Sequence, residues 1–154
     1  MVTNLNDNEC VQVLSNNYIG QLGYIYIDRP FVIPMTYFFD KENNSIVGYS
    51  EDGHKTMAMR NYRKVSLQVS EKKNDHICNS ILVHGIYEEL SGSGAKKHLH
   101  EFSAGIKELI SKKEHKNLHC ISDFSHKINT KNTPIVFKII IDEITGKKIT
   151  SDNS

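Results

Sequence analysis

Hydrophobic and polar residues alternate along most of this chain, which is the pattern of half-buried β-strands. The clearest segment is KVSLQVSE, where Val65, Leu67 and Val69 share one face and polar side chains share the other. Six segments are predicted to be strands on this basis, at residues 18–27, 31–39, 45–50, 64–71, 79–90 and 134–148. The first three are separated only by the short turns DRP and DKENN, so they predict a three-stranded antiparallel meander.

Two residues interrupt the predicted strands. Pro34 lacks a backbone N–H, so its strand is expected to be bulged or at a sheet edge there. Gly85 divides a long strand and predicts a bulge or a tight bend. Thr145 and Gly146 predict a turn after the last strand, and residues 149–154 are expected to be a disordered tail.

Three other segments have apolar residues at helical spacing. Residues 6–16 predict a short amphipathic helix with Asn6 or Asp7 as its N-cap. A helix of about two turns is expected after Gly53. The main helix is predicted from an apolar face that ends near Lys113 and comprises Leu99, Phe102, Ile106, Leu109 and Ile110. The chain is therefore expected to be mainly β, with an antiparallel small barrel covering the strand edges and a few flanking helices.

Length and charge narrow the possible functions. With 154 residues, 38% of them hydrophobic, the chain predicts a single domain spanning 1–154, with its core at about 18–148. The formal net charge of +1 argues against a nucleic-acid partner, including the oligonucleotides that some small barrels bind. No apolar run is long enough for a membrane span and MVTNLNDNEC lacks signal-peptide features, so a cytoplasmic location is expected.

Cysteine and histidine spacings give no metal site. Cys10, Cys78 and Cys120 are odd in number and far apart, so they are interpreted as reduced structural thiols. The candidate ligand pairs are His98 with His100, and His115 with His119 beside Cys120. Both lie in strongly polar stretches without a catalytic glutamate, so they are interpreted as solvated surface histidines.

The segment GYSEDGHKTMAMR (48–60) is the main chemical candidate. Its two glycines resemble a P-loop, but His54 separates Gly53 from Lys55, whereas a P-loop needs the lysine directly after the glycine. The short turns between the neighbouring strands also exclude the parallel crossover that a P-loop requires. The sequence therefore excludes ATP or GTP hydrolysis at this segment.

An anion site is still compatible with the same segment. A strand is predicted to end at Ser50 and a helix to begin near His54, which leaves backbone N–H groups and the positive end of the helix dipole available. A lysine at position 55 is electrostatically disfavoured there by about 0.3–1 kcal/mol, unless an anion compensates it. Glu51 and Asp52 could provide that compensation within a solvated turn. From the residues alone both interpretations stay open.

Most of the chain, from about Tyr18 to Lys148, resembles a known family. The relevant runs are IGQLGYIYIDRPFVIPMTYFFDKENNSIVGYSEDGHKTMAMRNYRKVSLQV, SILVHGIYEEL and IVFKIIIDEITGKK, in that order. They resemble the flavin-nucleotide-binding branch of the pyridoxamine 5′-phosphate oxidase-like proteins, which includes the nitroimidazole-resistance proteins. The resemblance implies a six-stranded antiparallel split β-barrel of Greek-key topology, and a homodimer that binds FMN at the subunit interface.

The resemblance also implies site residues. The run IPMT is similar to the strand whose main chain lies against the isoalloxazine ring, and YSEDGHK is similar to the segment that holds the flavin phosphate. Asn79 and Ser80 match a strand start that carries polar flavin contacts. The implied cofactor-binding residues are Ile33, Pro34, Met35, Thr36, Tyr49, Ser50, His54, Lys55, Asn79 and Ser80.

Two departures from the family pattern bear on activity. True pyridoxamine phosphate oxidases end in an arginine-rich segment, whereas this chain ends in ITGKKITSDNS, so oxidation of vitamin B6 is not expected. Nitroimidazole-resistance relatives often have a histidine in the third strand, and Gly48 occupies that place here. Reduction of nitro drugs is therefore not the expected activity either.

The leading hypothesis is an FMN-dependent oxidoreductase that passes electrons or hydride from a donor to a small acceptor. The redox chemistry would belong to the flavin, and no residue is identified as an obligatory acid or base. The alternative is a non-catalytic flavin- or haem-binding module of the same fold, with His84 or His98 as the candidate haem ligand.

Overall fold

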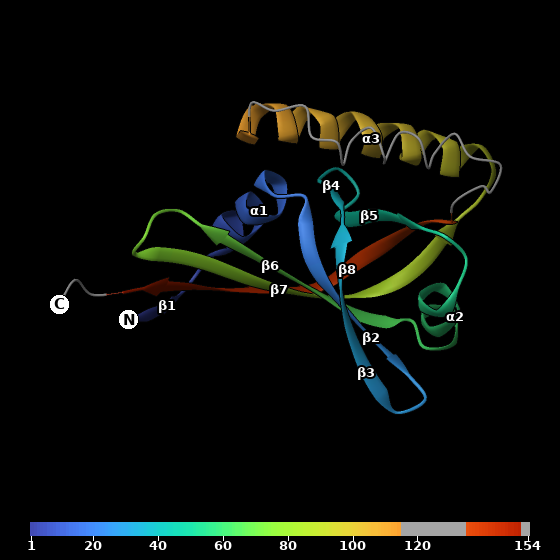
Figure 1. The fold of residues 1–154 in the computed structure, drawn as a ribbon, viewed down its shortest axis with the longest axis horizontal. Helices are drawn as coiled ribbons and strands as arrows, with labels where there is room; N and C mark the ends of the chain where they lie inside the picture. The colour runs from blue at the N-terminus through green and yellow to red at the C-terminus, as the bar shows by residue number, and fades with distance from the viewer. Residues whose placement is uncertain (115–134, 152–154) are drawn as a thin grey trace.

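The chain forms an antiparallel sheet with three helices against it (Figure 1). The computed structural model describes residues 1–114 and 135–151. Within these residues the helices are α1 (Asp7–Asn16), α2 (His54–Asn61) and α3 (Gly92–Glu114). The strands are β1 (Val2–Asn4), β2 (Ile19–Tyr26), β3 (Arg29–Thr36), β4 (Phe38–Asp40), β5 (Ser45–Ser50), β6 (Lys64–Lys72), β7 (Ile77–Leu90) and β8 (Ile135–Thr150). The predicted β-rich, antiparallel class is confirmed, with eight described strands where six were expected.

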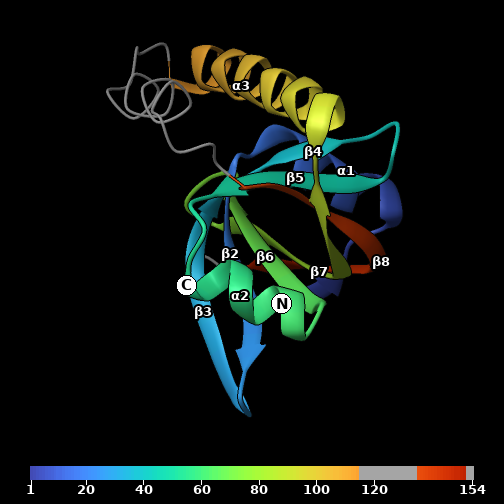
Figure 2. The same cartoon turned by 90° about the vertical axis from the view of Figure 1, so that its right-hand side faces the viewer.

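The order of the strands makes the sheet curl. The order is β3-β2-β6-β7-β8-β5-β4, with β1 on β8 in addition. The two end strands, β3 and β4, are consecutive in the chain and are separated only by Tyr37. One stretch of chain therefore supplies both ends of the sheet, which bends into a split barrel (Figure 2). Both pairings of the predicted meander are present, but its middle strand is divided at Tyr37, so β3 pairs with β2 and β4 pairs with β5 at the two ends of the sheet.

Tyr37 is fixed at the point where the chain passes from one end of the sheet to the other. Its side chain is fully buried, and its hydroxyl donates to the carbonyl oxygen of Leu14 in α1 at 2.9 Å. Its backbone N–H donates to the carbonyl oxygen of Tyr18 at 2.8 Å. The junction is thus held by α1 and by the segment leading into β2.

Helix α1 confirms the helix predicted at 6–16. Asn6 is its N-cap, and the Asn6 Oδ1 accepts from the Glu9 N–H while the Glu9 carboxylate accepts from the Asn6 N–H, both at 2.8 Å. This reciprocal capping box satisfies two backbone donors that the first turn of a helix leaves without partners.

Strands β7 and β8 form the long spine of the sheet. Their register shifts between His84 and Gly85, which lie opposite Glu143 and Ile141. The irregularity predicted at Gly85 is present, but the extra residue, Asp142, belongs to β8. A Cβ at position 85 would lie 2.5 Å from the carbonyl oxygen of Ile140, so no larger residue fits there without a backbone shift.

The predicted end of the last strand is wrong. Strand β8 continues through Thr145 and Gly146 to Thr150 and pairs with β1 and β7. Gly146 lies under the N-terminal segment, where a Cβ would be 2.8 Å from Leu5 Cδ1 and Cys10 Sγ. Residues 149 and 150, expected in a disordered tail, are therefore strand residues, and 152–154 lie outside the described part of the chain.

Pro34 lies on β3, at one end of the sheet. The register between β2 and β3 is regular, with Gln21 opposite Pro34. The predicted edge position is therefore confirmed and the predicted bulge is absent, because at an edge a proline removes no hydrogen bond from the ladder.

Two hydrophobic clusters stabilise the fold. The larger fills the inside of the curled sheet and includes residues from α1 and α2. The smaller lies under α3, where Phe102, Ile106 and Ile110 pack against Val47 and Val136. Figure 1 shows α3 lying across β4 and β5. Among the described helices, none has the length and apolar character needed to cross a bilayer.

Tyr37→Phe should lower the free energy of unfolding by about 1–3 kcal/mol, because it leaves the buried Leu14 carbonyl without its donor. Urea unfolding followed by circular dichroism measures the change. The control is Tyr62→Phe, at a ring that is 46% exposed, and it should change stability by less than about 0.5 kcal/mol. Equal effects of the two substitutions would contradict the role given to the Tyr37 hydroxyl.

Candidate functional site

The segment between β5 and α2 has the predicted form. Strand β5 ends at Ser50 and helix α2 begins at His54, with Gly53 as its N-cap. The Ser50 hydroxyl donates to the carbonyl oxygen of Glu51 at 2.9 Å. A Cβ added at Gly53 would meet no atom within 4 Å, so the start of α2 is open.

A polar cluster that the sequence did not predict orders this turn. The Gly53 N–H donates to Thr56 Oγ1 at 3.0 Å, and the Thr56 hydroxyl lies 3.0 Å from Asp52 Oδ1. Thr56 is fully buried. The same Asp52 oxygen accepts from Arg60 Nη1 at 3.0 Å. Asp52, one of the two acids considered as counterions for Lys55, is thus bound by Thr56 and Arg60.

His54 lies in an aromatic cluster formed with the β2–β3 hairpin. Its ring centroid is 4.8 Å from that of Tyr26 and 5.0 Å from that of Phe31. Its Nδ1 is 3.3 Å from the Tyr24 hydroxyl, and the Tyr24 ring stacks on Phe31. The sequence-based analysis did not identify these aromatic residues, although the alternating tyrosines of YIYI place both on one face of β2. The cluster orients the imidazole at the first residue of α2.

Tyr49 and Ser50 point to opposite sides of β5. Tyr49 meets the Phe102 ring of α3 edge-on, with centroids 5.4 Å apart. Burial, with a smaller contribution from the charge of Glu51, raises the pKa of Tyr49 to about 12. The Tyr49 side chain therefore belongs to the α3 contact, whereas Ser50 lies next to the start of α2.

Gly48 faces Met35 of the predicted flavin strand. A Cβ at Gly48 would lie 2.5 Å from Met35 Cε and 2.8 Å from Phe137 Cζ. The space that a side chain at position 48 would need is thus filled by Met35 and Phe137. At the position where the resemblance to nitroimidazole-resistance proteins implied a histidine, this chain therefore has packed core atoms.

The four predicted residues of β3 alternate between two environments. Met35 is buried and Ile33 packs against the main core, whereas Pro34 and Thr36 lie on the other face, opposite Gln21 and Ile19 of β2. Because β3 ends the sheet, one side of its main chain pairs with no strand among the described residues. This edge is what a main-chain contact with a ligand requires.

Asn79 and Ser80 also point to opposite faces. Asn79 is 4% exposed, and its Oδ1 has no hydrogen-bond partner among the described residues. Ser80 Oγ accepts from the Gln68 side-chain amide at 2.9 Å, on the same sheet face as Pro34 and Thr36. The structure therefore brings together Ser50, His54 and Lys55 at α2, and separately places Pro34, Thr36 and Ser80 on the outer face.

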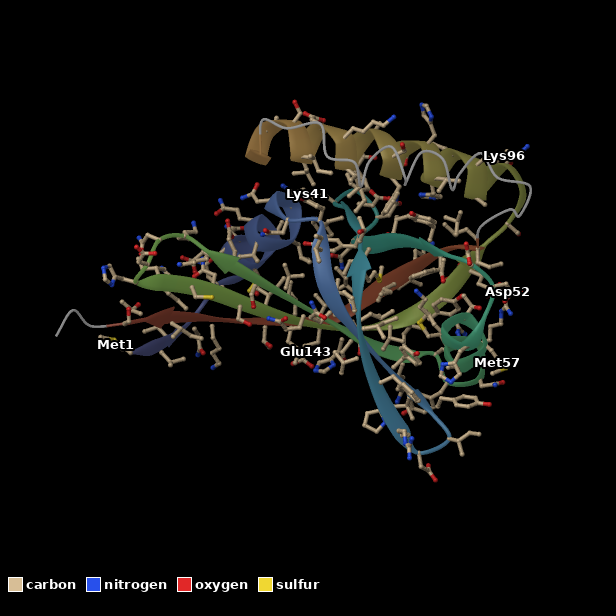
Figure 3. The ribbon with its side chains drawn as sticks, in the orientation of Figure 1. Met1, Lys41, Asp52, Met57, Lys96 and Glu143 are labelled. Carbon is tan, nitrogen blue, oxygen red and sulfur yellow. The ribbon has the colours of Figure 1, made fainter. Side chains whose placement is uncertain are left out.

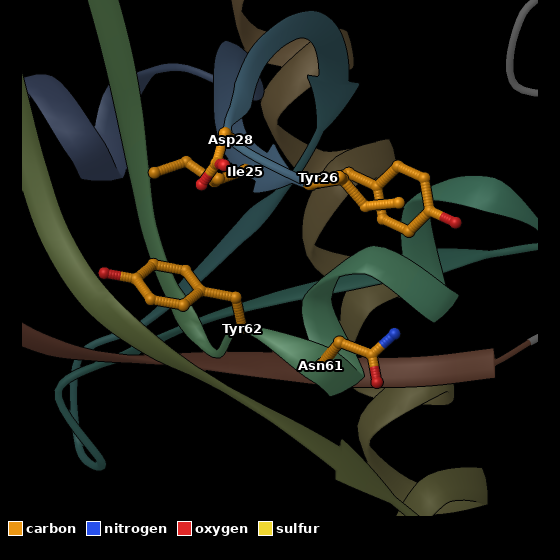
Figure 4. Close-up of a pocket in the computed structure, with 6 residues that line it drawn as sticks. Ile25, Tyr26, Asp28, Asn61 and Tyr62 are labelled. Carbon is orange, nitrogen blue, oxygen red and sulfur yellow. The ribbon is translucent and has the colours of Figure 1, made fainter.

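The outer face of the sheet is rich in exposed apolar side chains. The exposed fractions are 70% for Val32, 52% for Ile19 and 38% for Leu82. A groove of about 500 Å³ on this face is lined by residues that include Val32, Tyr62 and His84. A neighbouring hollow of about 460 Å³ is lined by residues that include Ile25, Asp28 and Tyr62 (Figure 4).

The histidines show no metal site within the described residues. His84 Nδ1 is 2.7 Å from the Ser66 hydroxyl, and His98 Nδ1 is 3.8 Å from a Glu101 carboxylate oxygen on the same helix. Two of the sequence candidates, His115 and His119 beside Cys120, lie outside the described part of the chain.

Gly48→Ala should lower the free energy of unfolding by about 1–3 kcal/mol, because the new methyl group overpacks the contact with Met35 and Phe137. Met35→Ala makes room for the methyl group, so the double variant should be more stable than the sum of the two single effects predicts. Differential scanning calorimetry measures both effects. Gly94→Ala, at an open position of α3, is the matched control and should not destabilise the protein. Strict additivity would contradict the contact.

Comparisons with known proteins agree with the fold. The family model described as pyridoxamine 5′-phosphate oxidase matches residues 6–148. An uncharacterised protein of Rhizobium meliloti (strain 1021) is 28% identical over 142 residues, covering 90% of this chain and 89% of that protein. A FAD-binding protein from Mesorhizobium loti has a similar structure, with a TM-score of 0.76 and 24% identity over 98% of both chains.

A protein described as a 5-nitroimidazole antibiotic resistance protein, from Bacteroides thetaiotaomicron, also has a similar structure. The TM-score is 0.70 and the identity 15%, over 99% of this chain and 92% of that chain. At such identities the two solved structures establish the fold, whereas the family model covers nearly the whole sequence. The split barrel and the family match together show that this chain belongs to the pyridoxamine 5′-phosphate oxidase family.

Proposed function

We propose that this protein binds FMN and acts as an oxidoreductase that passes electrons or hydride to a small acceptor. The observation that carries the proposal is the placement of Ser50, His54 and Lys55 at the open start of α2, in a chain that matches the family over residues 6–148. The similar Mesorhizobium loti protein, which is FAD-binding by name, supports a flavin in general.

The start of α2 is suited to the flavin phosphate. The first N–H groups of a helix have no partners within the helix, and the helix dipole favours an anion there. Lys55 adds a positive charge, His54 adds one when protonated, and Ser50 has a hydroxyl that could turn from Glu51 towards the ligand. These donors therefore fit a phosphate. The repulsion between the positive charge of Lys55 and the positive end of the helix dipole is offset once the anion binds.

The edge of β3 is suited to the isoalloxazine ring. The main chain of residues 33–36 lies at the end of the sheet, so its outward N–H and C=O groups can pair with the polar edge of the ring. Pro34 and Thr36 present side chains on the outer face, where they would contact the ring. When bound, the flavin supplies the redox chemistry, and the protein holds it and excludes water.

A second copy of the chain is the proposed cover of the outer face. Exposed Ile19 and Val32 lie on the paired strands β2 and β3 of that face, and Leu82 lies on β7, with the polar Gln68 of β6 between them. A face that mixes exposed apolar and hydrogen-bonding side chains is typical of subunit interfaces. FMN between β3 and the partner would be shielded from water on both sides.

Two features favour an activity other than those of the named relatives. The C-terminal run ITGKKIT is paired within the sheet and contains no arginine, so it does not match the arginine-rich segment of true pyridoxamine phosphate oxidases. Position 48 is packed against Met35 and has no histidine, unlike the nitroimidazole-resistance pattern. The acceptor is therefore proposed to be a small molecule of another class.

The purified protein should be yellow, or should quench FMN fluorescence on titration. Lys55→Ala should weaken FMN binding by about 1.5–3 kcal/mol, because a charge-assisted bond to the phosphate is lost. Riboflavin, which lacks the phosphate, should bind the variant and the wild type alike. Lys107→Ala, at an exposed position of α3, is the control.

A colourless protein that leaves flavin fluorescence unchanged would contradict the proposal. A Soret band after haem addition, abolished by replacing His84 or His98, would favour the haem-binding alternative. Tighter binding of FAD than of FMN would retain a flavin site and overturn the assignment of FMN.

Val32→Glu should convert the dimer to a monomer and weaken FMN binding together, because it places a charge in the apolar outer face. Sedimentation equilibrium and fluorescence titration measure the two effects. Val2→Glu is the matched control, since Val2 is 61% exposed on β1, at the far end of β8. A monomeric wild-type protein would exclude the proposed interface.

A further inference from the structure

A chain of polar contacts connects the start of α2 to the barrel core. Tyr87, which is 2% exposed, donates its hydroxyl to Glu89 Oε1 at 2.8 Å. The same oxygen accepts from Arg60 Nε, and Arg60 Nη1 donates to Asp52 Oδ1 at 3.0 Å. Figure 3 labels Asp52 in the turn before α2 and Met57 on the helix itself. Arg60 therefore connects the last turn of α2 with the turn that precedes the helix.

Two acidic residues in this turn, Glu51 and Asp52, carry a charge that opposes an anion, and Asp52 is the one that Arg60 binds. The Asp52 Oδ1 lies 3.0 Å from Thr56 Oγ1, which accepts from the Gly53 N–H, so its carboxylate lies beside the start of α2, where the phosphate is proposed to bind. At physiological ionic strength the Debye length is about 8 Å, so charges within one turn of chain act on each other with little screening. Without a counterion, Asp52 would repel a phosphate at the start of α2.

Arg60 compensates part of this charge and holds the carboxylate in place. Its guanidinium is bound by Asp52 through one nitrogen and by Glu89 through another, and Glu89 is itself fixed by Tyr87. Thr56 binds the same Asp52 oxygen from the buried side of the helix. The two carboxylates occupy Arg60, so it is placed to orient Asp52 and not to bind the phosphate itself.

We propose that Arg60 is a positioning residue for phosphate recognition: by pairing with Asp52 it makes the start of α2 able to accept the phosphate of a flavin nucleotide. This inference rests on the proposed FMN site and deepens it, because it makes discrimination between FMN and riboflavin depend on a residue that contacts neither. The prediction is specific to the phosphate, since the isoalloxazine ring is proposed to bind along β3, which includes neither Arg60 nor Asp52.

The experiment compares FMN and riboflavin binding by fluorescence titration of the full chain. Arg60→Ala should weaken FMN binding by about tenfold, equivalent to about 1.4 kcal/mol, and leave riboflavin binding unchanged. Asp52→Asn in the Arg60→Ala background removes the exposed negative charge and should restore FMN binding to within about twofold of the wild type. Arg60→Gln provides a second variant of similar size, and thermal unfolding of each variant is measured alongside.

The outcomes separate the inference from the proposed function. Unchanged FMN affinity in both Arg60 variants overturns the inference while the FMN site stands. Weak binding that Asp52→Asn does not restore shows that Arg60 contacts the phosphate, which also overturns the positioning role. Equal loss of FMN and riboflavin binding indicates a purely structural role and overturns it as well. A wild-type protein that binds neither flavin overturns the proposed function and this inference with it.

Discussion

The whole fold depends on one stretch of chain that supplies both ends of the sheet. Residues 29–40 form β3 and β4, which lie at opposite ends of the strand order and are separated only by Tyr37. A flat sheet cannot satisfy that connection, so the sheet curls, and its inner face encloses the main hydrophobic cluster. The buried Tyr37 hydroxyl, bonded to Leu14, ties α1 to this junction.

The same connection creates the features that the proposed site uses. β3 pairs on one side only within the described sheet, so its main chain is available along the other side. The hairpin formed by β2 and β3 projects from the barrel and brings Tyr26 and Phe31 against His54 (Figure 1). The start of α2 is thereby oriented towards the strand that is proposed to hold the flavin ring.

Polar contacts determine how the start of α2 interacts with an anion. A helix N-terminus attracts anions, but Asp52 would counteract that attraction unless its charge were compensated. Thr56 and Arg60 both bind Asp52, and Glu89 with Tyr87 connects this pair to the core. Met35 and Phe137 fill the space that a side chain at Gly48 would need.

The sequence alone determined the elements, because alternation and capping are local properties. It located α1 with Asn6 as one of two N-cap candidates, β5 ending at Ser50, α2 beginning near His54 and the buried face of α3. It also placed the proposed phosphate segment correctly between a strand and a helix. Each of these features depends on residues within a few positions of one another, and their periodicity is visible in the chain itself.

Only the tertiary structure decided what distant residues do to one another. Strand β8 continues through Gly146 because β1 and β7 pair with it and Leu5 covers the glycine, which no local turn signal reveals. The break at Tyr37 depends on a partner in α1, and the pairing of Arg60 with Glu89 spans 29 positions. The faces of Tyr49 and Asn79 likewise depend on what packs against each strand. Such contacts form only when the sheet curls, so they determine the site while leaving no periodic signal in the sequence.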